Sequence, residues 1–434
     1  MTALELARLP LASWRSPLPD RYVTSSLAGV GGGIKQRPED FRVDELPLYA
    51  ATGSGEHLYL TIEKRSRPTL EVVRDVARYF GVRMNDVGYA GMKDKQAVTT
   101  QRLSVRSNDD RAADRLSVPG VRVLKIERHA NKLRVGHLRG NRFVVRIRGT
   151  ADLSGAARRA SDILASLESR GVPNFFGAQR FGFHLMNHEV GRQYLLRDWA
   201  GVCRAILGPV PDPTPDDAPA RAAFASGDLK AAAALWSDKH LIERTLARLL
   251  ANGATDQYAV NQIQYAQRTF FVTAFQSALF NHALAQRIEA GALESLVVGD
   301  VAYLHRNGAL FDVTDEEIAS SDLMSRVASR EVSPSGPLWG PEMKRAAGPV
   351  DELESRLLTE SGLSLADMAR PPVHAPGARR SFRIFPAGIS VKTGVDEFGP
   401  FLGVAFELPP GSFATTVLAE ILKPAPRFHP WGSE

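Results

Sequence analysis

The chain of 434 residues lacks several features that define common protein classes. It has 1 cysteine, Cys203, which excludes an intrachain disulfide, a CxxC redox pair and any zinc site built on two or more thiolates. It also lacks the run of about 18 apolar residues that a transmembrane helix needs. The opening segment carries Glu5, Arg8 and Pro10 where a signal peptide needs a clean apolar stretch. We therefore expect a cytoplasmic protein with no membrane partner.

Nucleotide-binding and metal-binding motifs are also missing from the sequence. The glycine run GVGGGIKQ has no adjacent GK[ST], so it fails as a phosphate loop, and it does not fit GxGxxG. His184 and His188 are four residues apart, but the segment HLMNH lacks the glutamate of HExxH. No Gly-x-Ser-x-Gly elbow supplies a serine nucleophile. The sequence predicts neither a cofactor nor a bound metal.

The charge that is present is mildly positive and concentrated in one region. Lys plus Arg total 54 against 48 for Asp plus Glu, giving a net charge of +6. Between residues 121 and 148, nine basic residues accompany a single acid, Glu127. Strand alternation in NRFVVRIR places Arg142, Arg146 and Arg148 on one face. We expect that face to be exposed and to contact phosphate groups.

Apolar content of 44% predicts a large core, and the length suggests two to three domains. Local patterns predict a mixture of strands and helices. The helix that follows residue 68 has Thr69 placed to cap its start and Gly81 placed to end it. The expected elements are strands near 41–43, 57–62, 297–304 and 401–408, a short strand running into a loop over 87–101, helices near 70–80, 156–170, 258–290 and 414–422, and an exposed loop over 209–220.

Asp94 is the strongest catalytic candidate on residue chemistry. It lies between Lys93 and Lys95 in a glycine-containing loop, and a positioned, ionised carboxylate can act as a covalent nucleophile. Taken alone, such a segment is more typical of a solvated turn. Residues 173–183, PNFFGAQRFGF, add aromatic rings and amides suited to an unstacked base. The same aromatic rings fit an apolar core equally well.

Six sequence blocks carry a resemblance to a known family. They are KQRPEDFRVDE, GSGEHLYLTIEK, VGYAGMKDKQAVTTQ, GVPNFFGAQRFG, PSGPLWG and LPPGSFATTVLAEIL, and they run from Lys35 to Leu422. Their order resembles the TruD family, the transfer-RNA pseudouridine synthases D. The resemblance implies an α+β fold, in which a mixed, largely antiparallel-sheet pseudouridine synthase catalytic domain is interrupted by an α/β insertion (TRUD) domain. We expect the catalytic domain over 1–199 and 375–434, with the insertion over 200–374.

The resemblance also implies an activity, a partner and a set of site residues. The activity is isomerisation of uridine to pseudouridine in transfer RNA, at uridine 13 in the bacterial members, with no cofactor or metal. By motif position, Asp94 resembles the nucleophile and Lys35 its basic partner. The residues implied to contact the target nucleotide are Phe41, Asn174, Phe176, whose ring would stack on the uracil, and Phe413.

Several points stay open at this stage. The carboxylate could attack C6 of the uracil or C1′ of the ribose, or assist glycal formation as a base. Phe175 stands where many relatives carry Tyr, and Glu420 lacks the preceding Arg of many relatives, so neither receives a role. The sequence does not fix the oligomeric state, for which a monomer is our expectation.

Two other functions are compatible with the residues alone. A non-catalytic RNA-binding or RNA-folding protein would keep the basic surface and the pocket, and would bind RNA without turnover. An acid-dependent enzyme that acts on a small phosphorylated substrate would gain nothing from a polynucleotide. Release of tritium from C5 of uridine in RNA separates the three, since only bond formation at C5 produces it.

Overall fold

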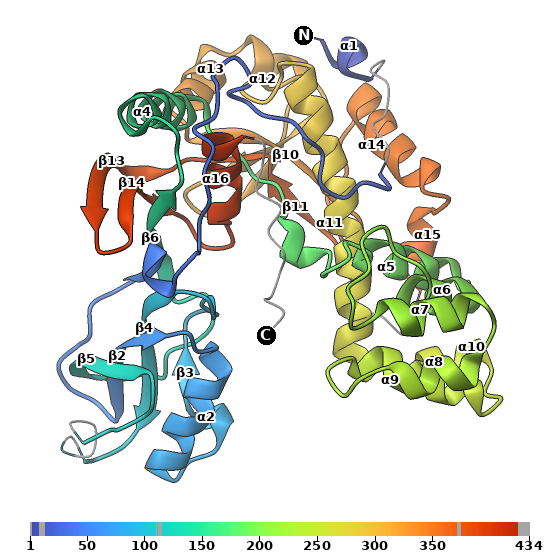
Figure 1. Cartoon of the computed structure of the whole chain (residues 1–434). Helices are drawn as coiled ribbons and strands as arrows, with labels where there is room; N and C mark the ends of the chain where they lie inside the picture. Colours follow the sequence, from blue (N-terminus) through green and yellow to red (C-terminus); the bar gives the residue numbers. More distant parts are fainter. Residues whose placement is uncertain (1, 8–13, 110, 112–114, 371–374, 424–434) are drawn as a thin grey trace. The chain divides into compact units, whose positions relative to one another are not determined.

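The structure, a computed structural model, describes residues 2–7, 14–109, 111, 115–370 and 375–423. The chain divides into two compact units, whose elements are labelled in Figure 1. Among the described residues, one unit contains Val23–Val172 and 384–423, and we call it the sheet unit. The other contains the residues up to Tyr22 together with Pro173–Arg383, and we call it the helical unit.

The unit boundaries differ from the expected domain boundaries. The sequence analysis places them after residues 199 and 374, and the second of these lies outside the described residues. The compact units divide instead at 172/173 and 383/384. The reason is local, because the main chain of Phe176 is hydrogen-bonded to the side chain of Asn281 in the helical unit. A separate domain over 200–374 stays a prediction.

The sheet unit is built on one eight-stranded sheet. Its strands are β1 (Phe41–Pro47), β2 (His57–Arg65), β3 (Gly88–Tyr89), β4 (Val98–Arg106), β5 (Val121–His129), β6 (Leu138–Arg148), β13 (Ala387–Asp396) and β14 (Gly399–Leu408). They follow the order β13-β14-β6-β1-β4-β2-β5, with β3 paired to β4. The β1–β4 pair is parallel and the other pairs are antiparallel. This confirms the mixed, largely antiparallel sheet.

Apolar helix faces cover the sheet. Helices α4 (Leu153–Arg170) and α16 (Ala414–Leu422) pack with β6 and β14 in one core, which includes Ile163, Val145 and Leu402. Helix α2 (Thr69–Phe80) contributes to a second core with β2 and β4. The predicted helices over these three segments are confirmed.

The ends of α2 show one correct prediction and one wrong one. Gly81 ends the helix with φ at +65°, a conformation that glycine adopts without steric cost. The predicted N-cap role of Thr69 is wrong, because Pro68 occupies that position and makes no side-chain cap. The hydroxyl of Thr69 is used elsewhere, since it accepts from the Lys93 main-chain N–H and donates to Gln101.

The helical unit surrounds α11 (Tyr265–Glu289), a 25-residue helix that is buried along most of its length. A small antiparallel sheet has the order β11-β10-β8-β9. The expected helix over 258–290 is interrupted at residues 262–264. The elements of this unit are α1 (Ala3–Ala7), α5 (Asn187–Leu196), α6 (Trp199–Leu207), α7 (Ala218–Ala225), α8 (Leu229–Leu235), α9 (Leu241–Ala251), α10 (Asp256–Asn261), α12 (Asp315–Ala319), α13 (Ser321–Ala328), α14 (Gly348–Glu360), α15 (Leu365–Met368), β8 (Val301–Leu304), β9 (Leu310–Asp312), β10 (Val332–Leu338) and β11 (Ala378–Ser381).

Residues 209–220 do not form the fully exposed loop that their Pro and Asp content predicts. Helix α7 begins within them, and Asp217 is buried. The Asp217 carboxylate accepts from the Thr214 main-chain N–H and from the Arg221 guanidinium. Burial opposes ionisation, but the hydrogen bonds from Arg221 and Thr214 outweigh it and lower the pKa of Asp217 to about 2. The neighbouring donors therefore allow this acidic segment to pack.

The basic face of β6 is less open than the alternation predicts. Arg142 is exposed, but Arg148 is buried. The guanidinium of Arg148 pairs with Asp40 and Asp396 over 2.7 Å each. Its hydrogen bonds lower the pKa of Asp396 to about 2. The expectation that Arg148 contacts phosphate is therefore wrong, because carboxylates from distant segments occupy its donors.

Candidate active site

Asp94 lies in the loop that joins β3 to β4, and its carboxylate pairs with Lys35. Lys35 Nζ donates to Asp94 Oδ2 over 2.9 Å. The Lys35 and Asp94 side chains are 22% and 44% exposed, respectively. An ion pair this open to solvent contributes little to the free energy of unfolding. Stability therefore does not explain why the two side chains are paired. The Asp94 carboxylate is held by a cation and remains accessible.

Lys35 connects this carboxylate to an aromatic ring. Its Nζ lies 4.2 Å from the centroid of the Phe41 ring, a cation–π distance. The backbone of Lys35 has φ at +57°, a region that residues other than glycine rarely adopt. Such conformations concentrate at functional sites, where surrounding structure compensates their cost. Lys35, Phe41 and Asp94 thus form one chain of contacts.

The two predicted phenylalanines of the sheet unit differ in burial. Phe41 begins β1, is 1% exposed and contacts Phe143 edge-on. Phe413 precedes α16 at its N-cap and is half-buried. Phe41 therefore contributes to the core as well as to the contacts around Lys35. The role of each in nucleotide binding stays a prediction.

A buried scaffold holds the loop just before Asp94. Lys93 Nζ and Glu45 form a 2.7 Å ion pair whose side chains are almost fully buried. The Lys93 main-chain N–H donates to Thr69 Oγ1 over 3.0 Å. The second oxygen of Glu45 accepts from the main-chain N–H of Arg102 on β4. The residue before the candidate nucleophile is thereby fixed to β1, α2 and β4.

Lys64 is a second buried lysine at this loop, and the sequence analysis missed it. Its Nζ donates to the main-chain carbonyl oxygens of Asp94 and Arg67 over 2.8 and 2.6 Å. Burial lowers the pKa of Lys64 to about 8, although the charge of Asp94 raises it in part. A sequence signal existed, because Lys64 follows Leu58, Leu60 and Ile62 on the apolar face of β2.

Asn174 and Phe176 lie in the helical unit, where Asn174 is held by its neighbours. The side chain is 6% exposed, and its Nδ2 donates to the Ser381 carbonyl oxygen over 2.9 Å. Its Oδ1 accepts from the Arg380 guanidinium. The Asn174 main-chain N–H donates to the Phe382 carbonyl oxygen. These contacts fix the start of the PNFFG block against β11.

Phe176 is 9% exposed and lies beside two guanidinium groups. Arg380 is 4.4 Å and Arg180 is 5.6 Å from its ring centroid. Asn281 binds both the N–H and the carbonyl of Phe176, which fixes the main chain of that residue. The ring also meets Phe280 edge-on at 5.6 Å.

The two arginines beside Phe176 were not predicted as site residues. Burial lowers the pKa of Arg380 to about 10, and it lowers the pKa of Arg180 as well. Arg180 donates to Ser277 on α11 over 3.1 Å. Arg180 stands in the QRFG segment itself, which was a visible signal. Arg380 comes from a segment more than two hundred residues away in sequence, so a single sequence does not connect it with Phe176.

Glu420, which the sequence analysis left unassigned, has a structural position. Its carboxylate accepts from the main-chain N–H groups of Val23 and Thr24, over 2.8 and 3.1 Å. It also accepts from the Thr24 hydroxyl over 2.5 Å. The residue is buried in α16. Glu420 therefore attaches that helix to the first residues of the sheet unit.

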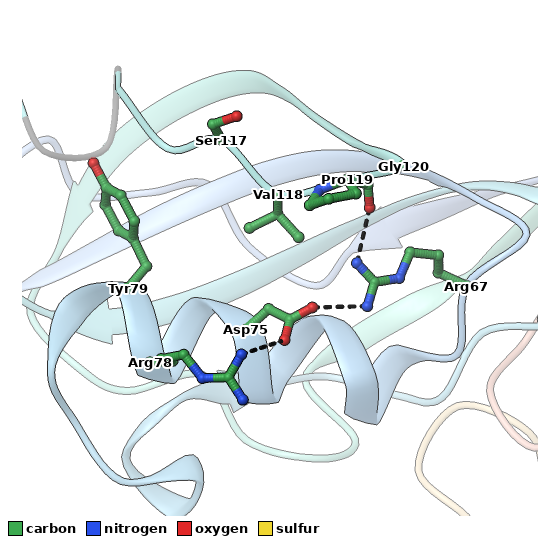
Figure 2. A pocket seen from close by; sticks show the side chains of 8 residues that line it. All are labelled: Arg67, Asp75, Arg78, Tyr79, Ser117, Val118, Pro119 and Gly120. Atoms are coloured by element: carbon green, nitrogen blue, oxygen red, sulfur yellow. Dashed lines mark hydrogen bonds and ion pairs between the residues drawn. The ribbon is translucent and has the colours of Figure 1, made fainter.

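A cavity of about 680 Å³ lies elsewhere in the sheet unit, between α2 and the segment before β5 (Figure 2). At its wall, Arg67 donates to Asp75 over 2.7 Å and to the Pro119 carbonyl oxygen over 2.8 Å. Arg78 lies 3.7 Å from the same carboxylate. The lining residues are Arg67, Asp75, Arg78, Tyr79, Ser117, Val118, Pro119 and Gly120, and they include none of the six predicted site residues.

The two histidines of HLMNH contact different partners. His184 Nε2 lies 2.6 Å from Asp217, whereas His188 Nε2 lies 3.2 Å from the Arg15 carbonyl oxygen. In the described ranges, no group of three or more His, Cys, Asp or Glu side chains is arranged to hold a metal ion. A search of the same part of the chain finds no helix with the length and apolar character needed to cross a membrane.

Comparison with known proteins agrees with the sequence blocks. The family model described as tRNA pseudouridine synthase D (TruD) matches residues 19–421. The chain is 40% identical to tRNA pseudouridine synthase D of Geotalea daltonii, over 93% of this chain and 99% of that protein. It is 39% identical to the Geobacter metallireducens protein of the same name, over 93% and 98%. The crystal structure of a Methanosarcina mazei protein described as a tRNA pseudouridine synthase D superposes with a TM-score of 0.80 at 26% identity, over 96% of this chain and 99% of that one. The chain belongs to the tRNA pseudouridine synthase D family.

Proposed function

We propose that this protein converts uridine 13 of transfer RNA into pseudouridine, with Asp94 as the nucleophile. Family membership supports transfer-RNA pseudouridylation. The observation that carries the assignment of Asp94 is its open ion pair with Lys35, held on a buried scaffold. The carboxylate is paired with a neighbouring ammonium, yet it is exposed enough to meet a substrate.

The proposed reaction rearranges one nucleoside without net redox change or hydrolysis. The N1–C1′ bond breaks, the detached uracil turns, and a C5–C1′ bond forms. N1 gains a proton and C5 loses one, so atoms and charge balance. The Asp94 carboxylate acts by attack on C6, by attack on C1′, or as the base in glycal formation, and these routes share its position beside the ribose and ring. Lys35 orients the carboxylate in each.

The target nucleotide must leave its stack before it reacts. Flipping a base costs a few kcal/mol, which aromatic stacking and phosphate contacts offset. We assign those contacts to Phe41, Asn174, Phe176 and Phe413, with the Phe176 ring on the uracil. The guanidinium groups of Arg180 and Arg380 add positive charge beside that ring. Arg142 on β6 is a candidate for contact with phosphate because it is exposed.

We further propose that residues 200–374 form an insertion that grips the body of the transfer RNA. The six predicted site residues all lie outside this range, and the catalytic carboxylate lies in the sheet unit. The insertion therefore supplies affinity and leaves the chemistry to Asp94. We expect the protein to act as a monomer.

Tritium release from transfer RNA labelled at C5 of uridine tests the proposed activity. The protein is expected to release tritium in proportion to pseudouridine formed, because the C5 hydrogen is lost only when C5 bonds to C1′. Tight binding of transfer RNA without tritium release would instead favour a non-catalytic RNA-binding or RNA-folding protein. Release from free uridine monophosphate at the same rate would favour a small-molecule enzyme.

A further inference from the structure

Lys64 is enclosed beneath the loop that carries Asp94. Its side chain extends from the apolar face of β2, and the residue is 0% exposed. Its Nζ donates to the carbonyl oxygens of Arg67, Asp94 and Lys93, over 2.6, 2.8 and 3.4 Å. All three acceptors are neutral main-chain groups. The ammonium therefore contacts peptide dipoles, and none of these three hydrogen bonds goes to a carboxylate.

This arrangement is costly for a residue with only a packing role. A buried ammonium without a contacting anion loses hydration that three carbonyl dipoles replace incompletely. The pKa of Lys64 falls to about 8 because burial disfavours its charge. Costs of this kind persist where the group serves function, and perturbed ionisable groups concentrate at reactive sites. The charge of Asp94 acts in the opposite direction and favours the ammonium.

The contacts of Lys64 differ from those of the neighbouring scaffold. Glu45 and Thr69 fix the side chain and N–H of Lys93, which precedes Asp94. Lys64 binds the carbonyl groups on both sides of the Asp94 Cα, namely those of residues 93 and 94. It ties them to the carbonyl of Arg67, which lies two residues before α2 begins. These bonds set the orientation of the two peptide planes from which the Asp94 side chain projects.

We propose that Lys64 is a positioning residue that orients the Asp94 carboxylate toward Lys35 and the target nucleoside. The proposal rests on the proposed role of Asp94 as the nucleophile. Without the three hydrogen bonds, Lys93 stays fixed by Glu45 and Thr69, but the carbonyl of Asp94 loses its buried donor and its peptide plane can turn. Displacement of a reacting atom by about 1 Å lowers the rate of a catalysed step by about a hundredfold. Substrate binding by the rest of the protein is not affected by that displacement.

The test measures the steady-state kinetics of Lys64→Met and Lys64→Gln by tritium release from labelled transfer RNA. Methionine fills a similar volume without donors or charge, and glutamine keeps a donor without charge. We expect kcat to fall by about a hundredfold in Lys64→Met and by less in Lys64→Gln, the scale of a misplaced reacting group. KM and the dissociation constant for transfer RNA should stay within about threefold, since phosphate and stacking contacts dominate affinity.

Lys423→Met is the matched control in the same unit. Lys423 is another lysine with lowered pKa through burial, and its Nζ donates to the Leu27 carbonyl oxygen over 3.0 Å and to Thr24. It anchors the end of α16 to Thr24 and Leu27. We expect Lys423→Met to lower the melting temperature and to leave kcat of the folded protein unchanged.

The outcomes separate this proposal from the proposed function. If the wild type releases tritium and both Lys64 variants have the same kcat as the wild type, the proposed activity stands and the positioning role is overturned. A parallel loss of kcat and transfer-RNA affinity would also overturn it, as would failure of both variants to fold, which would assign Lys64 to the fold alone. Absence of release by the wild type would reject the proposed function itself.

Discussion

The loop that carries Asp94 and the segment that carries Asn174 and Phe176 hold their candidate residues in different ways. In the loop, the carboxylate is 44% exposed, while the Lys93–Glu45 pair and Lys64, which hold the main chain of the loop, are buried. In the segment, Asn174 is 6% exposed and its polar side-chain atoms are bonded to Arg380 and Ser381 of the same unit. The loop presents an accessible carboxylate on a fixed main chain, whereas the segment presents a fixed ring beside cations.

This difference suggests that chemistry and recognition are divided between the two regions. A carboxylate that acts as a nucleophile must be accessible to the substrate. Its position therefore depends on the buried contacts that fix the main chain of residues 93 and 94. A stacking ring needs only a defined plane, which Asn281 supplies by binding both main-chain groups of Phe176. Substitutions in the loop should then change turnover more than affinity. Substitutions near Phe176 should change both.

The largest expected effect is that of Asp94→Asn. The amide is nearly the same size but cannot act as the nucleophile, so kcat should fall by at least about a thousandfold. Affinity for transfer RNA and the melting temperature should change little, because the Asp94–Lys35 pair is exposed. Tritium release and filter binding check the two expectations. Asp86→Asn is the control and should keep the wild-type kcat, since Asp86 pairs with Arg83 at the surface. Substantial turnover by Asp94→Asn would reject the assignment of Asp94 as the nucleophile.

The next effect is a graded response to alanine at the three phenylalanines. Phe41→Ala should unfold most easily, since removal of a buried Phe ring costs about 3–5 kcal/mol. Phe413→Ala removes a half-buried ring and should lower turnover with a smaller loss of stability. Phe176→Ala should lower both turnover and affinity, by up to the 1–3 kcal/mol of roughly one base–aromatic stack. Thermal denaturation measures the loss of stability in each variant, and single-turnover rates measure the loss of turnover. If all three variants turn over at the wild-type rate per folded molecule, the rings belong to the core and not to the nucleotide site.

A third comparison separates Arg148 from Arg142 on one strand. Arg148→Ala leaves the buried Asp40 without its cation and should cost about 3–5 kcal/mol of unfolding free energy. Arg142→Ala should leave stability unchanged and flatten the salt dependence of transfer-RNA binding by up to about one unit of log–log slope. Urea unfolding and binding titrations over a range of salt measure the two. A flattened slope in a stable Arg148→Ala protein would contradict the structural role of that residue.

The smallest effect is a pH dependence that has the same origin in the two units, a buried basic group, but falls in different pH windows. Burial lowers the pKa of His282 to about 4, so the unfolded chain gains a proton between pH 6.5 and 4 that the folded chain does not. Stability of the helical unit should therefore fall as pH falls through that window, by at most about 3 kcal/mol. Burial lowers the pKa of Lys64 to about 8, so the sheet unit should gain stability as pH rises from 8 to 10.5.

Urea unfolding at a series of pH values checks both slopes. His282→Gln should reduce the acid slope, and the remainder comes from other buried histidines such as His305, whose pKa burial also lowers to about 4. Lys64→Met should reduce the alkaline slope. An unchanged slope in either variant would show that the substituted residue does not contribute to the titration.

Local sequence signals predicted the elements of the sheet unit well. The apolar segments FLGVAFEL and ATTVLAEIL located β14 and α16, because both elements are buried along most of their length. Gly81 marked the end of α2 through its positive φ. The sheet order was not available from these signals, since β14 pairs with β6, which precedes it by more than two hundred residues. The mixed sheet was predicted through the family resemblance.

Several of the errors and omissions concern charged side chains whose hydrogen-bond partners were not identified from the sequence. Arg148 looks solvent-exposed by alternation, but its partners Asp40 and Asp396 are 108 and 248 residues away in sequence. The composition around Asp217 predicts a solvated side chain, but Arg221 and Thr214 donate hydrogen bonds to its carboxylate, which allows it to be buried. Asp94 was the strongest catalytic candidate on residue chemistry, whereas its pairing with Lys35 was expected only through the motif resemblance. Long-range charge pairing is invisible in a single sequence, whereas Lys64 on an apolar strand face was a signal within reach.

The central claim is that Asp94 makes pseudouridine at position 13 of transfer RNA. The most direct measurement maps pseudouridine, position by position, in one unmodified transfer RNA incubated with the wild type and with Asp94→Asn at equal bound fractions. We expect modification at position 13 with the wild type and none with the variant. Modification by the variant at the wild-type rate, or an unmodified position 13 with the wild type, would contradict the claim.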